Sequence, residues 1–163
     1  MKQILGFLLT FLICTTIYAG TGSSAVEKQT TIDYEECVNK IYFNTDSFYE
    51  IVDTRVDQRK EINRDKNLLL LSNSNAVGQS TFQAEESRNV TKERAIFELK
   101  MTKPINGNLK AQRTNIEIKN INGKAKIIIK MTANVEHFFA SEKVINKELR
   151  KNAEKVILLF EQN

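Results

Sequence analysis

The sequence predicts an α+β protein, in which an antiparallel β-meander of three to five strands packs against an N-terminal and a C-terminal helix as a two-layer sandwich. Residues 94–133 alternate apolar and polar side chains along three stretches, which two Asn-Gly dipeptides separate. Apolar residues recur at helical spacing after Asp33 and again after Ser141. With 163 residues, 41% of them hydrophobic, the chain is long enough for one folded domain and too apolar for a disordered one.

The first 19 residues have the layout of a secretory signal peptide. Lys2 supplies a positive charge, Ile4–Ile13 is a largely apolar run, and Ala19 is the small residue that signal peptidase requires. The run is half as long as the ~20 apolar residues that a membrane-spanning helix needs. We therefore expect an exported protein, periplasmic or secreted, that is cleaved near Ala19, with cleavage after Ala25 as a second option.

Two other interpretations of this segment stay open. The first is an N-terminal anchor that is retained without cleavage. The second is a bacterial lipoprotein signal, in which Cys14 would be the lipidated residue. Leu12 and Ile13 disfavour lipidation, because they are bulkier than the residues that precede a lipoprotein cysteine. Cleavage would remove Cys14 and leave Cys37 with no partner for an internal disulfide. We expect Cys37 to be a buried thiol, with a reactive thiol or an intermolecular disulfide as the alternatives.

The mature chain is predicted to begin with a flexible leader over residues 20–31, which are small and polar, followed by a single domain over residues 32–163. Asp33 is expected to cap the first helix, and the helix should end near Asn44–Asp46. Its apolar positions are Tyr34, Cys37, Val38, Ile41 and Tyr42.

Residues 47–73 fit two different structures. Their apolar residues suit a helix that continues to Ile62, but they also suit a strand pair within Phe48–Leu71. We favour the strand pair, because Leu68–Leu71 has the composition of a short buried strand. Residues 72–90 are rich in Ser, Asn, Gln and Glu and are predicted to form a loop or an irregular strand.

The meander is the most specific part of the prediction. Asn106-Gly107 and Asn122-Gly123 are each typical of a two-residue type I′ hairpin turn. The turns would pair Phe97 with Ile116, Leu99 with Thr114, Ile116 with Ile129, and Ile118 with Ile127. Both registers place the apolar residues on one face, which a slip of one residue would not do.

A closing helix is predicted after Ser141, whose hydroxyl is expected to cap it. Its apolar stripe must lie on a sheet or on another helix, and the apolar face of the meander is the obvious partner. The stripe consists of Ile145, Leu149, Ala153, Val156 and Phe160.

Little in the sequence points to catalysis. His137 is the one histidine, whereas nucleophilic hydrolysis needs a histidine held by a third group and a zinc site needs about four ligands. Glu35/Glu36 and Glu85/Glu86 are neighbours that point apart, so they are interpreted as a helix N-terminus and a solvated loop. We predict no catalytic residue, metal site or cofactor. A small hydrolase that uses Cys37 with His137, or a carboxylate pair, is the less favoured alternative.

Lysines form the most regular surface pattern. One row recurs every four residues on the closing helix, and a second set shares one face of the predicted sheet. The rows are Lys143, Lys147, Lys151 and Lys155 on the helix, and Lys124, Lys126 and Lys130 on the sheet. They are candidates for binding an anionic membrane or polysaccharide, although the neighbouring glutamates favour an ordinary solvated face. No aromatic residue interleaves the sheet lysines, which disfavours single-stranded nucleic acid.

The order of signal, short helix, tentative strand pair, meander and closing helix resembles uncharacterised small envelope proteins and lipoproteins of Gram-negative bacteria. This resemblance implies location and fold and carries over no site residue. We expect an exported, non-catalytic protein that binds another envelope component. The alternative is a secreted effector or inhibitor that docks on another protein through a sheet edge. The sequence specifies neither the ligand nor the oligomeric state.

Overall fold

A computed structural model describes residues 19–43, 56–63, 68–75, 78–137 and 140–161. They form a seven-stranded antiparallel sheet in the order β1-β7-β6-β5-β4-β3-β2, together with two helices. The strands are β1 (Ala19–Asp33), β2 (Val56–Asn63), β3 (Leu68–Asn75), β4 (Gly78–Val90), β5 (Arg94–Asn106), β6 (Leu109–Ile121) and β7 (Lys124–Glu136), and the helices are α1 (Tyr34–Phe43) and α3 (Glu142–Glu161). The α+β class is confirmed, whereas the expected three to five strands are too few.

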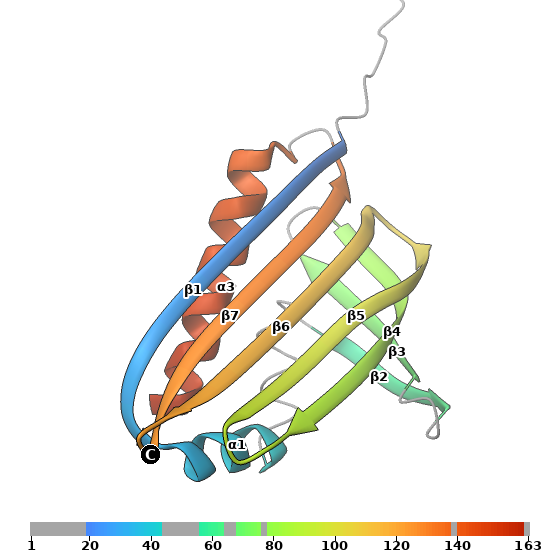
Figure 1. The fold of residues 1–163 in the computed structure, drawn as a ribbon. Coiled ribbons are helices and arrows are strands. Elements are labelled where there is room, and N and C mark those ends of the chain that lie inside the picture. The colour runs from blue at the N-terminus through green and yellow to red at the C-terminus, as the bar shows by residue number, and fades with distance from the viewer. Residues whose placement is uncertain (1–18, 44–55, 64–67, 76–77, 138–139, 162–163) are drawn as a thin grey trace, which may run out of the picture.

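The two helices occupy different places on the sheet (Figure 1). Helix α3 packs along β1 and β7 on one side, which we call the inner face; the opposite side is the outer face. Helix α1 lies at one end of the strands instead of covering a face with α3, as the two-layer prediction had it. Its Tyr34 explains this place: the backbone N–H donates to Gly123 O (2.9 Å) and the hydroxyl to Thr91 O (2.6 Å), both in hairpin turns.

The predicted meander is confirmed in its strands and in its register. All four predicted pairs are formed: Phe97 with Ile116, Leu99 with Thr114, Ile116 with Ile129, and Ile118 with Ile127. Asn122 (φ 54°) and Gly123 (φ 86°) both have the positive φ that a type I′ turn needs. The other turn differs, because Asn106 remains in β5 and its side chain accepts the Thr81 N–H (2.8 Å).

The flexible leader predicted for residues 20–31 is wrong, because these residues form most of β1. β1 pairs with β7 from Ala19↔Glu136 to Asp33↔Lys124, so that the start of the described chain lies beside its last strand. The small residues are needed for packing. A Cβ built on Gly20 would lie 2.0 Å from Ala140 O, and one on Gly22 would lie 2.4 Å from Ile145 Cγ2. Two glycines thus allow α3 to approach the backbone of β1.

The region from residue 47 to residue 90 was predicted only in part. A strand pair exists, but it joins Val56–Asn63 to Leu68–Asn75, so the alternative of a helix to Ile62 is wrong over its described residues. Residues 44–55 lie outside the described residues. Of the two structures predicted for 72–90, the loop is wrong and the irregular strand is confirmed over the described residues: β4 is a strand whose register with β5 shifts twice, and its Phe82 and Ala84 face inward and are buried. Polar residues occupy positions on both sides of this strand, which concealed the period of two.

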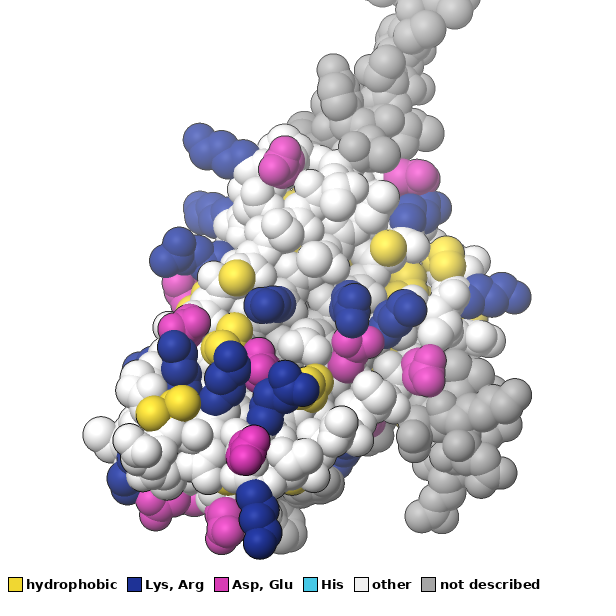
Figure 2. All heavy atoms as spheres, viewed as in Figure 1, with side chains coloured by type: hydrophobic (Ala, Val, Ile, Leu, Met, Phe, Trp, Pro, Cys, Tyr) yellow, Lys and Arg dark blue, Asp and Glu magenta, His cyan; other side chains and the backbone are white. Residues whose placement is uncertain are grey.

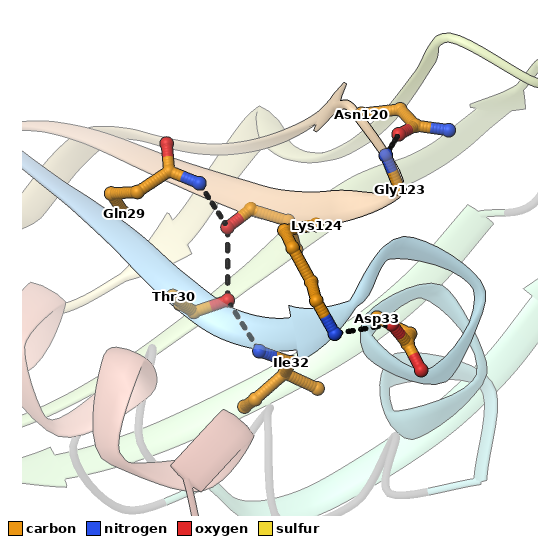
Figure 3. A network of polar contacts seen from close by, with 8 residues as sticks. Gln29, Thr30, Ile32, Asp33, Asn120, Gly123 and Lys124 are labelled. Atoms are coloured by element: carbon orange, nitrogen blue, oxygen red, sulfur yellow. Dashed lines mark hydrogen bonds and ion pairs between the residues drawn. The ribbon is translucent and has the colours of Figure 1, made fainter.

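The end of β1 contains a bulge that one buried hydroxyl stabilises (Figure 3). Thr30 Oγ1 donates to Ala125 O (2.9 Å) and accepts from the Ile32 N–H (3.3 Å), where the register with β7 shifts. Beyond the bulge, Lys124 Nζ lies 2.7 Å from Asp33 Oδ1. A carboxylate expected to cap α1 is therefore in an ion pair with the neighbouring strand, directly before the helix begins.

Both helices bury the predicted apolar positions. In α1 these are Tyr34, Cys37, Val38 and Ile41, and in α3 they are Ile145, Leu149, Ala153, Val156 and Phe160; the side chain of Tyr42, also predicted to be apolar core, lies outside those that the structure describes. Ser141 Oγ accepts the Val144 N–H at 3.4 Å, which confirms the predicted cap of α3. Neither described helix is long and apolar enough to cross a membrane.

Replacing Gly22 by alanine tests the contact between β1 and α3. The added Cβ would overlap Ile145, so the helix or the strand must shift, and we expect the free energy of unfolding to fall by about 1–3 kcal/mol. Thr21→Ala is the matched control, because Thr21 is exposed on the same strand. Equal chemical denaturation midpoints for the two variants would contradict this account of the glycines.

Candidate ligand-binding interior

The lysines singled out in the sequence lie on opposite sides of the molecule. The helix row, Lys143, Lys147, Lys151 and Lys155, is exposed on the side of α3 that points away from the sheet. The sheet set, Lys124, Lys126 and Lys130, lies on the outer face, because its neighbours Ala125, Ile127, Ile129 and Met131 are buried inward. The two sets therefore do not form one surface.

Carboxylates neutralise much of the outer face. Lys126 Nζ lies 2.6 Å from Glu27 Oε1, and Arg113 makes a charge-assisted hydrogen bond of 2.5 Å with Glu98. Figure 2 shows this face, with basic and acidic side chains interspersed over the strands. Such exposed ion pairs contribute little stability, but they lower the local positive potential. Binding of an anionic surface by these lysines stays a prediction.

The proposed pair of Cys37 and His137 is not brought together. Cys37 is buried in α1, at the end of the strands where β7 begins, and His137 follows Glu136, where β7 ends. A strand of that length separates its ends by about 40 Å. Burial also raises the pKa of the Cys37 thiol to about 11, although Lys40 opposes this rise. A thiol hydrolase built on these two residues is therefore wrong.

The inner face of the sheet is mainly apolar from β3 to β7. Its fully buried side chains are Leu71, Phe82, Ala84, Ala95, Ile116, Ile118, Ala125, Ile127, Ile129 and Met131. α3 adds its own apolar stripe opposite β1 and β7. The polar side chains on these two facing surfaces are consequently few, and each needs an explanation.

Glu86 and Arg88 form the first of these exceptions. The register pairs Glu86 with Leu99 and Arg88 with Phe97, which places both charged side chains on the inner side of β4. They form an ion pair with each other, and their side chains are 17% and 27% exposed. The interpretation of Glu86 as part of a solvated loop is thus wrong, while its neighbour Glu85 does point to the opposite face.

Thr114 and Asn152 are the second exception. Thr114 lies on the inner side of β6 and is 1% exposed, and Asn152 lies on the buried side of α3 and is 6% exposed. Thr114 Oγ1 and Asn152 Oδ1 are both buried without a hydrogen-bond partner. An unsatisfied buried polar atom costs about 1–3 kcal/mol, so two of them in one apolar interior require a reason.

Asn152 lies on the flank of α3 that is turned away from the edge strand. The opposite flank is marked by Asn146, whose Oδ1 accepts the Ser23 N–H (2.6 Å), and by Glu161, which lies 2.5 Å from Lys28 Nζ. At about 100° per residue, Asn152 is rotated by about 120° from Asn146 and by about 180° from Glu161. Asn152 is also rotated by only about 20° from Ile145, which contacts Gly22 of β1, so its amide lies on the side of α3 that packs on the sheet.

The two orphan atoms also lie at similar levels along the strands. Ile145 lies over Gly22, and seven further residues carry the helix about 10 Å to Asn152, which is about three residues along β1. Ser24, two residues beyond Gly22, pairs with Met131, which in turn pairs with Thr114. Thr114 and Asn152 thus lie at similar levels along the strands, one on the sheet and one on the helix.

Sequence patterns contained only part of this site. Thr114 belongs to an alternating apolar set, so its inward direction was predicted, but not its missing partner. Asn152 follows Leu149 by three residues and precedes Val156 by four, which is a core position of the helix. An asparagine at a core position of a helix was therefore the one feature of the sequence that could have indicated a buried polar group in α3.

Comparisons with known proteins identify the fold but no family. Neither protein-family models nor curated protein sequences match this chain. A solved protein from Thermus thermophilus matches with a TM-score of 0.62 and 10% identity, over 85% of this chain and 94% of its own. A START superfamily protein from Mycobacterium smegmatis matches with a TM-score of 0.51 and 11% identity, over 85% of this chain and 90% of its own. The chain has a START-like fold.

A third solved structure with this fold is the di-domain ARO/CYC protein of the steffimycin biosynthetic pathway. It matches with a TM-score of 0.59 and 9% identity, over 86% of this chain. The START-like chain spans about half of that protein, 49% of its length. At such identities the similarity concerns the fold alone.

Replacing Thr114 by valine tests whether its hydroxyl is an unpaired polar group. Valine has nearly the same shape and removes the cost of the orphan atom, so we expect the free energy of unfolding to rise by about 1 kcal/mol. Thr30→Val is the matched control: that buried hydroxyl has two backbone partners, and its loss should lower the free energy of unfolding by about 1–3 kcal/mol. Chemical denaturation measures both, and equal losses would contradict the assignment of Thr114 as unpaired.

Proposed function

We propose that this protein is an exported, periplasmic or secreted, non-catalytic binding protein, which holds a small and mainly apolar molecule between α3 and the inner face of the sheet. The observation that carries the proposal is the pair of buried, unpartnered atoms Thr114 Oγ1 and Asn152 Oδ1 in an otherwise apolar interior. A bound molecule with a polar group would supply the missing hydrogen bonds, and its apolar part would suit the surrounding side chains.

The START-like fold supports the same proposal. One solved protein with this fold is named for a biosynthetic pathway of a small molecule, steffimycin. Fold likeness does not transfer that protein's chemistry, and the thiol-imidazole pair considered for hydrolysis is separated here by the length of β7. Binding without catalysis is therefore the function that the arrangement of residues supports best.

The signal-like N-terminal sequence supports export. The fold favours one of the two cleavage sites, because they leave different lengths of β1 in the mature protein. Cleavage after Ala19 would leave nearly all of β1 intact. Cleavage after Ala25 would remove the strand residues that pair with β7 from Glu136 to Lys130, including Gly20 and Gly22.

We therefore expect the exported protein to begin at Gly20. Intact-mass measurement of the protein recovered from the periplasm or the medium of a bacterial host tests this. Replacing Ala19 by a bulky residue should retain the precursor, whereas the same change at Ala25 should leave processing unaffected. A mature chain that begins at Val26 would contradict the proposed cleavage site.

The proposed binding function is tested with an apolar fluorescent probe, N-phenyl-1-naphthylamine. We expect one probe to bind per chain with enhanced emission, because the interior excludes water. Thr114→Phe should weaken this binding, since it fills the interior from β6. Asn115→Phe is the matched control, because Asn115 is the next residue of the same strand and faces outward. Equal probe affinity of the two variants, with circular dichroism showing both folded, would place binding elsewhere.

A further inference from the structure

We propose that the solvent side of α3 is a docking surface for an anionic lipid membrane. The surface combines the four lysines of the helix row with two exposed apolar side chains of the same helix, and we call it the α3 docking surface. Its residues are Lys143, Val144, Lys147, Lys151, Lys155 and Leu158. The proposal concerns the outside of the helix and is independent of the proposed interior site.

The buried side of α3 determines which residues share this surface. Leu149 lies within the buried stripe of the helix. At about 100° per residue, Leu158 is rotated by about 180° from Leu149, and Val144 by about 140°. Each lysine of the helix row is rotated from Leu149 by about 120–160°. All six residues therefore lie on the half of the helix that is turned away from the sheet.

Two apolar side chains accompany the lysines on this half of the helix. Val144 is 50% exposed and Leu158 is 52% exposed. From residue 144 to residue 158 the helix rises by about 21 Å, with lysines of the row between them. The buried stripe on the opposite side already supplies the core contacts of α3, so folding does not require either residue to be apolar. One exposed apolar residue is ordinary on a surface, but two of them in line with a lysine row suit an amphipathic partner.

The carboxylates of α3 leave most of the charge of the helix row unneutralised. Glu154 lies 3.0 Å from Arg150 Nε, so a base outside the row neutralises it. Glu148 lies 4.0 Å from Lys151, which is the limit of an ion pair. The lysines of the row that have no ion-pair partner among the described residues are Lys143, Lys147 and Lys155. The surface is therefore positively charged.

The combination of positive charge and exposed apolar side chains selects a lipid membrane as the partner. An anionic bilayer attracts lysines to its headgroups, and the boundary between headgroups and acyl chains accepts apolar side chains. Lysine stems can lie along that boundary while their ammonium groups remain in water. A polysaccharide or a nucleic acid offers negative charge without such an apolar layer. Because the other side of α3 stays packed on β1 and β7, we expect shallow and reversible binding.

Flotation with lipid vesicles tests the proposal. Vesicles of phosphatidylcholine with about one quarter phosphatidylglycerol are compared with vesicles of phosphatidylcholine alone, at low ionic strength. The exported protein is used, because the apolar run of the signal sequence would itself bind lipid. We expect the protein to bind the anionic vesicles at least about tenfold more tightly, and added salt to weaken this binding.

A triple variant of the helix row measures the contribution of its lysines. Lys147→Gln/Lys151→Gln/Lys155→Gln should lower the partition coefficient for anionic vesicles about 100-fold, because each lysine near an anionic surface contributes about fivefold. Glutamine keeps the helix propensity, and the three positions are exposed, so the thermal midpoint should not change.

The same change in the sheet set is the matched control. Lys124→Gln/Lys126→Gln/Lys130→Gln removes the same net charge from the outer face, where Lys124 and Lys126 are already in ion pairs. We expect its partition coefficient to fall by less than about threefold. Equal losses in the two triple variants would show that net charge alone drives binding and would overturn the proposal. Failure of the unchanged protein to bind the anionic vesicles would overturn it as well.

Leu158→Gln distinguishes a membrane from a soluble polyanion. Leu158 should enter the headgroup boundary, so its replacement should weaken binding to the anionic vesicles about fivefold. Ile105→Gln is the matched control, because Ile105 is similarly exposed, at 50%, on β5, and it should leave binding unchanged. If Leu158→Gln binds the vesicles as tightly as the unchanged protein, with circular dichroism showing both folded, the surface recognises charge alone and the membrane assignment is wrong.

Discussion

The contact between α3 and the glycines of β1 determines the rest of the architecture. With Gly20 and Gly22 beneath its first turns, α3 lies close to the backbone of an edge strand and packs along β1 and β7. Asn152 follows Ile145 by seven residues and therefore lies on the same, buried side of the helix. A larger side chain at either glycine would lift the helix and change the space that the proposed ligand occupies.

The distribution of polar groups distinguishes structural positions from the candidate site. On the outer face, charged residues are paired or solvated, and at the end of β1 the buried hydroxyl of Thr30 has two backbone partners. Those groups are accounted for by folding alone, whereas Asn134 Oδ1 on the outer side of β7 is a third buried oxygen without a partner. Thr114 is more deeply buried, yet its hydroxyl has no partner. A protein retains such a destabilising group most readily where function needs it, which makes the interior the place to look for a ligand.

The parts of the fold that depend on residues close together in the sequence were predicted correctly. The Asn122-Gly123 turn fixed the register of β6 and β7, and the apolar stripe of α3 identified its buried side. β1 was missed, because its polar residues conceal a period of two and its partner β7 comes from a distant part of the chain. β4 was left between a loop and an irregular strand for the first of these reasons alone, since its partner β5 follows it directly. The missing partners of Thr114 and Asn152, and the opposite directions of the two lysine rows, exist only once the topology is known.

Because the sequence identity to solved proteins of this fold is low, any recognition of a bound molecule depends on the side chains that this chain itself places in the interior. At 10% and 11% identity, the same layout is built from different side chains, so the fold alone assigns no ligand to this chain. In the proposed function, specificity would come from the few polar groups that face the apolar interior. In this chain these include an ion pair on β4, which satisfies its own charges, and two neutral atoms that lack partners. The neutral pair is therefore the part of the interior best suited to recognise a polar group on a bound molecule.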